Sequence, residues 1–304
     1  MKDAFSSYHP AVSFLYFGLV LVFSMFFLHP VCLIISLAAA FAWSIYLKGR
    51  RAARFNLLFL LPTMLVMALV NPAFSHGGVT ILTYLPSGNP LTLESVVYGF
   101  AAGALLVCVM CWFSCYNCVM TSDQFVYLFG RVIPVLSLLL SMCLRFVPKF
   151  KAQLQVVSDA QKCVGRDLSN GGLLQRLHHA VRILSIMVTW ALENAIETAD
   201  SMKSRGYGLP GRTAFSIYRF DRRDRAALWT IAGLGGYILS MALAGGFYCR
   251  YFPSYKAAPW DLWSVSGFLA YLALCALPLA IDLWEDRKWR RRTAAIAAEG
   301  RQAQ

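Results

Sequence analysis

The chain has 304 residues, of which 58% are hydrophobic and 14% aromatic, and its formal net charge is +13. A mean hydropathy of +0.56 is too high for a soluble protein, and the apolar residues are gathered in blocks. The composition therefore excludes an ordinary soluble domain and indicates a polytopic membrane protein.

Six apolar blocks approach the roughly 20 residues that a helix needs to cross a bilayer. They cover residues 12–28, 31–47, 55–70, 96–120, 226–248 and 262–284. The first ten residues precede a block with no small-residue cleavage pattern, so we expect this span to be retained. The blocks predict an all-α polytopic membrane protein with about six transmembrane helices and both termini on one side.

Lys and Arg are distributed unevenly among the connections. They cluster at residues 48–54 and 287–292, whereas the connections at 29–30 and 71–95 contain none and Arg250 and Lys256 form a mild exception. Because cationic loops are retained in the cytoplasm, we expect both termini and residues 121–225 to be cytoplasmic. The cations also attract anionic lipids. The sequence has no basic stripe interleaved with aromatic residues, the pattern that would indicate a nucleic-acid partner.

Nine cysteines are present, and most lie in the apolar blocks, where they behave as small hydrophobic residues. Cys108, Cys111, Cys115 and Cys118 follow steps of three, four and three, which places them on one stripe of a helix. Four side chains along a straight helix cannot surround one ion tetrahedrally. We therefore interpret the stripe as a helix-packing surface and not as a metal site.

The chain divides into three predicted regions: transmembrane helices in 1–120, a cytoplasmic helical domain in 121–225, and the last spans with a basic tail in 226–304. In the middle region, the apolar segments 132–147 and 183–192 are short and bounded by charge. Such lengths favour buried or interfacial helices. Two additional crossings would leave the topology unchanged, so the charge pattern does not decide whether 132–147 crosses the membrane.

Two cytoplasmic helices are the clearest prediction in this region, one over 150–163 and a longer one over 173–205, joined by a turn at 167–172. The longer helix is amphipathic. Its apolar side contains Leu174, Leu177, Val181, Leu184, Val188, Ala191, Ala195 and Ala199. Such a side needs a cover, either a lipid surface or another protein.

The longer helix is expected to stop at Ser204-Arg205-Gly206. Arg205 complements the negative end of the helix, and Gly206 can adopt the positive φ of a C-terminal cap. A guanidinium on a rigid helix end can also pair with the carboxylates of an acidic groove. The sequence from Gly206 to Gly211 satisfies GxGxxG, but the dinucleotide fingerprint requires a strand before it, so we reject this interpretation.

These features resemble the transmembrane T component of energy-coupling factor transporters, the EcfT/CbiQ family of micronutrient importers. The similarity covers the apolar spans, Asn71-Pro72, Pro134, Pro148 and the paired cytoplasmic helices. The specific element is a short Ala-Arg-Gly-like motif near the end of each coupling helix. Ser204-Arg205-Gly206 matches it well.

The first copy of the motif departs from the family pattern. Cys163-Val164-Gly165 occupies the expected place, with Val164 where the family would have arginine, and Arg166 follows at the next position. Arg166 could substitute for the missing arginine, or the partner could have an altered groove. Both alternatives remain open from the sequence.

The resemblance implies a four-part importer in the bacterial cytoplasmic membrane, in which this chain is not an enzyme and binds no cofactor. Two cytosolic ABC ATPases would receive the helix ends, and a membrane S component would capture a vitamin or metal ion. The implied ATPase contacts are Ser204, Arg205, Gly206, Cys163, Val164, Gly165 and Arg166. The implied contacts with the S component are Leu177, Val181, Leu184, Val188 and Ala191.

Two other classes of function were compared with this one. A membrane-embedded enzyme needs titratable groups brought together, but His178 and His179 point to different helix faces, and Glu193 and Glu197 lie about four turns away. His29 and His76 are assigned no chemistry. A secondary transporter would show internal repeats, which we do not find, and the spans hold almost no charge apart from Asp282. No GxxxxGK[ST] phosphate-binding loop occurs either.

Overall fold

The computed structural model describes residues 4–75, 77–84, 90–130, 133–166, 172–210 and 218–302. Residues 167–171 of the turn predicted at 167–172, together with His76 and Gly211, lie outside these residues. Contacts divide the chain into two compact units, one formed by Met1–Thr121 with Tyr218–Gln304 and the other by Ser122–Ile217. Each unit is described separately.

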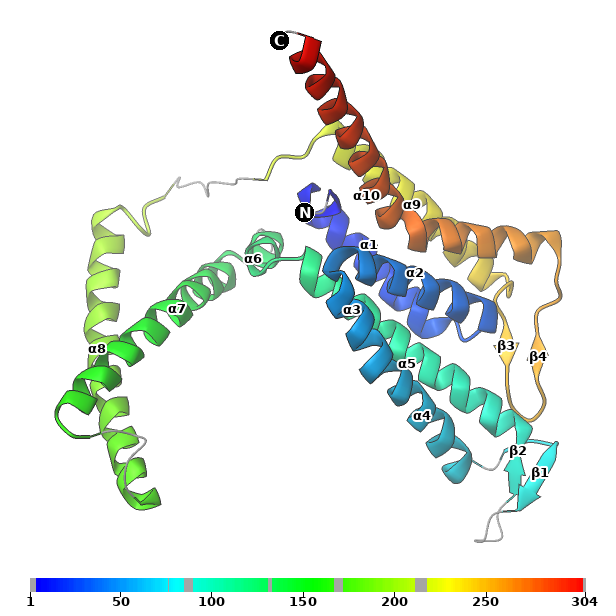
Figure 1. The fold of residues 1–304 in the computed structure, drawn as a ribbon, viewed down its shortest axis with the longest axis horizontal. Helices are drawn as coiled ribbons and strands as arrows, with labels where there is room; N and C mark the ends of the chain where they lie inside the picture. The colour runs from blue at the N-terminus through cyan, green and yellow to red at the C-terminus, as the bar shows by residue number, and fades with distance from the viewer. Residues whose placement is uncertain are drawn as a thin grey trace. The chain divides into compact units, whose positions relative to one another are not determined.

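The first unit is a bundle of apolar helices (Figure 1). Its elements are η1 (Phe5–Ser7), α1 (Pro10–Phe26), α2 (Pro30–Lys48), α3 (Arg50–Phe55), the π-helical turn η2 (Asn56–Leu60), α4 (Leu61–Phe74), α5 (Leu93–Val119), α9 (Arg222–Leu243) and α10 (Leu262–Gln302). Pro10, Pro30 and Leu93 follow His9, His29 and Thr92, whose side chains accept hydrogen bonds from the first helical turns. Proline suits the first turn because the missing N–H has no partner there.

The number of spans expected from the sequence agrees with this bundle. Among the described residues, five helices are long and apolar enough to cross a membrane, with Arg50–Phe74 counted as one, and Pro10–Phe26 is a shorter sixth. The chain is thus an all-α polytopic membrane protein. The predicted bounds were less accurate, because α9 begins at Arg222 and not at 226, and α10 continues far beyond 284. Pro278 lies within α10, which bends in Figure 1.

Two short hairpins close one end of the bundle and were not predicted. Strand β1 (Ile81–Tyr84) pairs antiparallel with β2 (Pro90–Thr92), and β3 (Cys249–Arg250) pairs with β4 (Lys256–Ala257). Strands of two to four residues leave too little alternation to be recognised in a sequence. The hydroxyl of Tyr251, between β3 and β4, donates to the carbonyl of Leu28 (2.7 Å) and fastens this hairpin to the end of α1.

The opposite end of the bundle gathers the charged residues. The hydroxyl of Tyr46 in α2 donates to Asp286 in α10 (2.6 Å), and Arg223 in α9 pairs with Glu285 in α10 (3.2 Å). These contacts place the cationic segments 48–54, 222–225 and 287–292 at the same end of the unit. The cationic segments that are separate in the sequence therefore lie together at one end of the bundle.

Asp282 is the one acidic residue expected within the last span, and it lies buried at this end. Its two carboxylate oxygens accept hydrogen bonds from the backbone N–H of Phe5 and from Nε1–H of Trp43, each at 3.0 Å. Buried carboxylates require such partners. Asp282 therefore fastens the N-terminal turn to α2 and α10.

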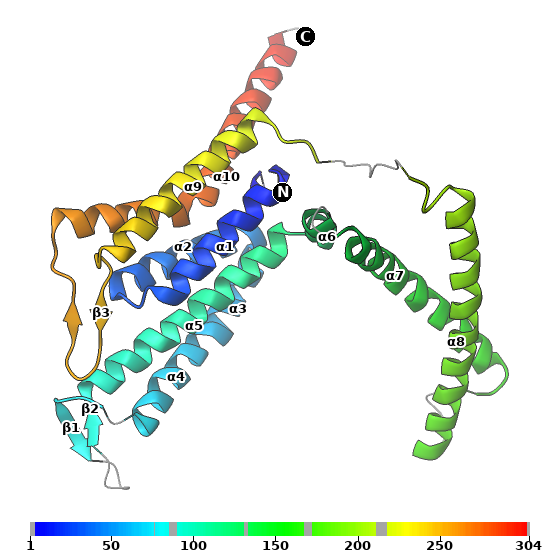
Figure 2. The same ribbon diagram turned by 180° about the vertical axis from the view of Figure 1, so that it is seen from behind.

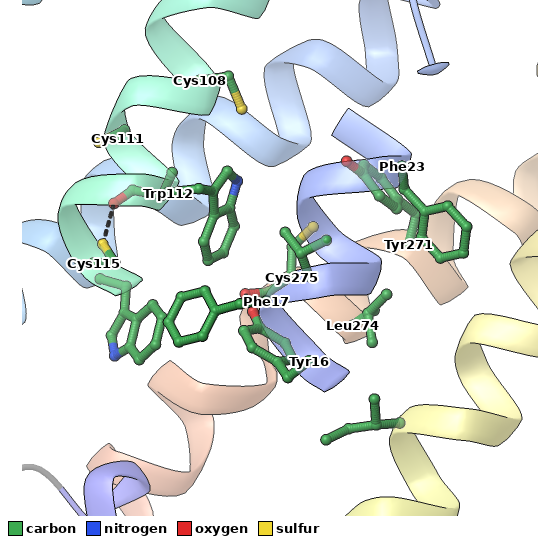
Figure 3. Close-up of a cluster of buried hydrophobic side chains, with 14 of the residues drawn as sticks. Tyr16, Phe17, Phe23, Cys108, Cys111, Trp112, Cys115, Tyr271, Leu274 and Cys275 are labelled. Carbon is green, nitrogen blue, oxygen red and sulfur yellow. Dashed lines mark hydrogen bonds between the residues drawn. The ribbon is translucent and has the colours of Figure 1, made fainter. Parts of the chain in front are cut away.

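Aromatic side chains fill the centre of the bundle (Figure 3). Phe17 stacks on Trp43 with ring centroids 5.5 Å apart, and Tyr16 meets Trp112 edge to face at 6.1 Å. Phe5 from the N-terminal turn packs edge-on against Trp43 at 5.7 Å. Aromatic pairs in these geometries contribute roughly 0.5–1.5 kcal/mol beyond the area that they bury.

The cysteine stripe of α5 faces α2. Cys108 donates to the hydroxyl of Ser36 (3.0 Å), and Cys115 lies against the carbonyl of Ala40 (3.9 Å). Figure 3 shows Cys108, Cys111 and Cys115 along α5. Cys108, Cys111 and Cys115 are buried in this packing. Cys118 is exposed, so the predicted packing stripe is wrong for its fourth member.

Two glycines on a different face of α5 pack against α4. A Cβ on Gly99 would lie 2.9 Å from the carbonyl oxygen of Ala68, and one on Gly103 would lie 2.8 Å from that of Met64. The spacing of four residues is the small-xxx-small pattern that lets membrane helices approach closely. Figures 1 and 2 show α4 and α5 side by side along their lengths.

In the part of the second unit that the structure describes there are three helices, α6 (Ser122–Gly130), α7 (Pro134–Cys163) and α8 (Leu173–Ser204). The prediction of separate segments at 132–147 and 150–163 was wrong, because α7 is one helix that runs through Pro148. The charged residues around Pro148 suggested a boundary, yet a proline can be accommodated within a long helix. Among the helices of the described residues, α7 is not one of those that are long and apolar enough to span a membrane.

Candidate functional site: the ends of two long helices

The helices α7 and α8 meet at a small crossing, which both ribbon views show (Figures 1 and 2). Its buried centre is formed by Val157 of α7 and by Ile183 and Met187 of α8. Phe150 meets Trp190 edge to face beside them, with ring centroids 5.5 Å apart. The described part of this cluster is confined to these residues, and the two helices, of 30 and 32 residues, extend well beyond it as long arms.

A lysine reinforces the crossing from its edge. The ammonium group of Lys149 donates to Oδ1 of Asn194 and lies 5.5 Å from the centroid of the Trp190 ring. The sequence suggested only that Lys149 ends an apolar segment. Its role at the crossing could not be deduced, because the partners are more than forty residues away in the chain.

The predicted apolar face of α8 lies outside this crossing. Ile183 packs against α7, whereas its neighbour Leu184 is turned by about 100° around the helix and is 62% exposed. The same holds for most of the side chains assigned to contact with an S component. Leu177, Val181, Leu184 and Val188 are exposed, and Ala191 is half-buried. This face has no cover within the described residues.

The C-terminal end of α8 is a Schellman motif. Arg205 is the cap residue, and Gly206 has a φ of 77°. The N–H of Gly206 donates to the carbonyl of Lys203 (2.9 Å). The N–H of Tyr207 donates to the carbonyl of Met202 (3.0 Å). These two bonds satisfy carbonyls that the helix end would leave unpaired, and they hold Arg205 exposed at the tip.

The C-terminal end of α7 repeats this geometry. Val164 is the cap residue, and Gly165 has a φ of 79°. The N–H of Gly165 donates to the carbonyl of Lys162, and the N–H of Arg166 donates to that of Gln161, both at 2.9 Å. The motif is therefore present twice in the second unit, although residues 160–166 and 201–207 share only a lysine (Lys162 and Lys203) and a glycine (Gly165 and Gly206).

The repeated geometry defines which residues correspond. Val164 has φ −91° and ψ 10°, and Arg205 has φ −84° and ψ 9°, so both occupy the same position of the same cap. Arg166 corresponds to Tyr207, two positions later, and is half-buried. Val164 is 64% exposed. One helix therefore presents an arginine at its tip and the other presents an apolar side chain.

The structure gives ordinary structural roles to the residues that the sequence offered as alternative sites. The glycines from Gly206 onward follow a helix, and the dinucleotide fingerprint requires a strand. The ring centroids of His178 and His179 are 6.4 Å apart, and His178 is exposed whereas His179 is half-buried. His29, to which no chemistry was assigned, accepts a hydrogen bond from the N–H of Val31 (3.3 Å) and caps α2. The His-Pro dipeptide was the signal that could have revealed this cap.

Comparison with known proteins agrees with this arrangement. A family model described as CbiQ, cobalt transport protein, matches residues 4–215, which include the first spans and both helix ends. The chain belongs to the EcfT/CbiQ family.

Several proteins named energy-coupling factor transporter transmembrane protein EcfT are similar to this member of the family. Those of Lactobacillus helveticus and Exiguobacterium sibiricum are 34% identical over 105 residues and 33% identical over 113 residues. These alignments cover 34% and 37% of this chain and 38% and 42% of the relatives, so less than half of each relative's length is matched. The EcfT of Bacillus selenitireducens is 25% identical over 221 residues, or 69% of this chain and 79% of the relative.

Proposed function

We propose that this chain is the T subunit of an energy-coupling factor importer, and that α7 and α8 transmit motion from two cytosolic ABC ATPases to a membrane S component. The observation that carries the proposal is the pair of identical Schellman caps at the tips of two long arms. Membership of the EcfT/CbiQ family and the names of the similar proteins support it.

The arms have dimensions suited to this task. The 32 residues of α8 span about 48 Å at 1.5 Å per residue. The crossing at Met187 lies seventeen residues, or about 26 Å, from Ser204 at the end of the arm. A helix of this length is stiff, so a displacement of its tip is transmitted to the crossing and to the exposed apolar face.

Each tip would insert into a groove of one ATPase. Arg205 presents a planar guanidinium that can bind a carboxylate with two hydrogen bonds. Val164 presents no charge at the equivalent position, so its groove is expected to be apolar there. The two ATPase subunits would therefore be different chains, or a single kind of chain whose groove accepts both side chains.

The exposed face of α8 would contact the S component. It is apolar along several turns, from Leu177 to Val188, and such a face requires a cover. The S component would capture the nutrient, a vitamin or a metal ion. We place the complex in the bacterial cytoplasmic membrane, with both termini and the second unit on the cytoplasmic side.

Charge reversal at the tip tests this function. Arg205→Glu would repel an acidic groove and place a negative charge at a helix C-terminus, where it is unfavourable. Expressed with its genomic neighbours, the variant should retain ATPase at least tenfold less well during purification. Lys203→Glu, in the same last turn, is the matched control for the charge of the helix end and should retain most of the ATPase.

The opposite substitution tests the correspondence of the two tips. Val164→Arg restores the charge that Arg205 has at the equivalent cap, so tighter ATPase binding would identify the first tip as a degenerate motif. An unchanged complex after Arg205→Glu would contradict the proposed role. Turnover or substrate uptake by the purified chain alone in liposomes would instead favour a membrane enzyme or a secondary transporter.

A further inference from the structure

The last helix does not end where its apolar span ends. After Trp284 the sequence becomes Glu285-Asp286, and five of the following six residues, 287–292, are Lys or Arg. The helix continues without interruption to Gln302. These cations are therefore held in a fixed order on a helix that leaves the bundle, and not on a disordered tail.

Among the described residues, the cations of 287–292 form no ion pair with a carboxylate. Glu285 pairs with Arg223, and Asp286 accepts the hydroxyl of Tyr46. Residues 287–292 are exposed, and among the described residues none of their side chains lies within 4.0 Å of a carboxylate. The local excess of positive charge is thus open to an external anion.

A second helix adds cations at the same level. The ion pair between Arg223 and Glu285 (3.2 Å) joins the first turn of α9 to α10 at the start of the basic segment. Arg222 and Arg225 flank Arg223 and are exposed. Asp224, in the same turn, is buried and accepts the N–H groups of Asp221 and His9, so its carboxylate is directed into the unit and the two arginines remain on the surface. Two helices therefore present cations around one point.

The height of the cations along α10 matches the lipid headgroup layer. Arg287 and Lys288 follow Trp284 by three and four residues, or about 4.5–6 Å along the helix axis. The headgroup layer adds about 5–7 Å on each side of the hydrocarbon core. Arg291 and Arg292 lie about 10–12 Å beyond Trp284, which is more than the Debye length of about 8 Å at physiological salt.

The aromatic residues indicate the same level. Trp284 is 62% exposed and Trp289 is 66% exposed, and the ammonium group of Lys288 lies 4.9 Å from the centroid of the Trp284 ring. Tryptophan is enriched at the boundary between hydrocarbon and headgroups. A groove on another protein would not explain an exposed indole at the last apolar turn of a span.

We propose that the first turn of α9 and residues 287–292 of α10 form a binding site for the phosphate headgroup of an anionic phospholipid. Arg287 and Lys288 contact the phosphate, Trp284 lies at the top of the acyl chains, and the cations further along add long-range attraction. This site does not depend on the proposed coupling function, because it uses no residue of the second unit.

The test uses the purified full-length chain in a neutral detergent, with binding of phosphatidylglycerol and phosphatidylcholine measured by native mass spectrometry and by the shift in melting temperature. Phosphatidylglycerol should bind more tightly and should raise the melting temperature. Each cation near the surface contributes about fivefold to the affinity, so Arg287→Gln/Lys288→Gln should weaken binding about 25-fold. Arg291→Gln/Arg292→Gln removes the same charge further away and should have a clearly smaller effect.

The possible outcomes separate this site from other ligands of the same charge. Equal binding of the two lipids, or equal small losses in the two double variants, would overturn the proposal. Protection by inorganic phosphate equal to that by phosphatidylglycerol would identify a site for free anions and would also overturn it. If Arg287→Gln/Lys288→Gln loses a copurifying acidic protein but keeps its preference for phosphatidylglycerol, the surface is a protein interface and the proposal is overturned. An unchanged melting temperature of the variants in phosphatidylcholine shows that they are folded.

Discussion

The contact between α4 and α5 gives a direct test of the packing in the membrane unit. Gly103→Ala adds one methyl group, and an ideal Cβ there would lie 2.8 Å from the carbonyl oxygen of Met64 and 3.3 Å from its Cα. Both atoms belong to the backbone of α4, so a change of side-chain rotamer cannot relieve the overlap. The helices must separate.

The magnitude follows from two opposing terms. Alanine is favoured over glycine within a helix by about 0.5–1 kcal/mol, and overpacking of a close contact costs about 1–3 kcal/mol. Gly18→Ala in α1 measures the first term alone, because a Cβ at Gly18 meets nothing within 4 Å. The difference between the two variants should therefore equal the overpacking cost, and Gly103→Ala should be less stable than Gly18→Ala by about 1–3 kcal/mol.

The buried cysteines supply the assay. Cys32, Cys108, Cys111, Cys115 and Cys275 are buried, so a thiol-reactive fluorophore should report their exposure as the detergent-solubilised protein unfolds on heating. The exposed cysteines contribute a constant background that is the same in both variants. Equal melting temperatures for the alanine variants at positions 18 and 103 would refute the close approach of α4 and α5.

Two further substitutions test contacts elsewhere in the chain. Lys149→Met removes the hydrogen bond to Asn194 and the contact with the Trp190 ring. Hydrogen exchange of the backbone amides at the α7–α8 crossing should therefore become faster, by a factor that corresponds to about 1 kcal/mol. Lys151→Met is the control, because Lys151 lacks these contacts, and it should leave the exchange rate unchanged. Burial lowers the pKa of His29 below its ordinary value of 6.5. Below pH 6.5 the unfolded chain therefore takes up a proton that the folded chain does not, and the stability of the fold decreases as the pH falls. His29→Asn keeps a capping side chain without this titration, so its melting temperature should change less between pH 7 and pH 5; an unchanged slope would contradict the role of His29.

The sequence alone predicted most of the architecture of the membrane unit. Apolar blocks of nearly 20 residues are a strong signal, because a bilayer satisfies backbone groups only within helices and closed barrels. The ends of the helices were less certain, since α9 extends into the charged segment that begins at Arg222. The hairpins were missed because their strands are too short to show a periodicity.

For the candidate site, the sequence identified both helix ends, and the family resemblance placed Val164 where the second motif has Arg205. Gly206 was recognisable as a cap, because only glycine adopts a positive φ without steric cost, and the first helix was expected to end just before Gly165. The structure adds the shared geometry: Val164 and Arg205 are the cap residues of two helix ends that have the same pattern of hydrogen bonds. The apolar face of α8 was likewise visible in the sequence, but the side that packs on α7 was not.

Local chemistry therefore determined the membrane spans, the caps and the amphipathic character of α8, because each depends on residues close together in the chain. Tertiary structure alone decided which residues meet across long separations. Lys149 reaches Trp190 and Asn194, Asp282 holds Phe5 and Trp43, and Arg223 brings the cations of α9 beside those of α10. Such contacts depend on how helices cross, and the crossing is fixed by the fit of many side chains at once.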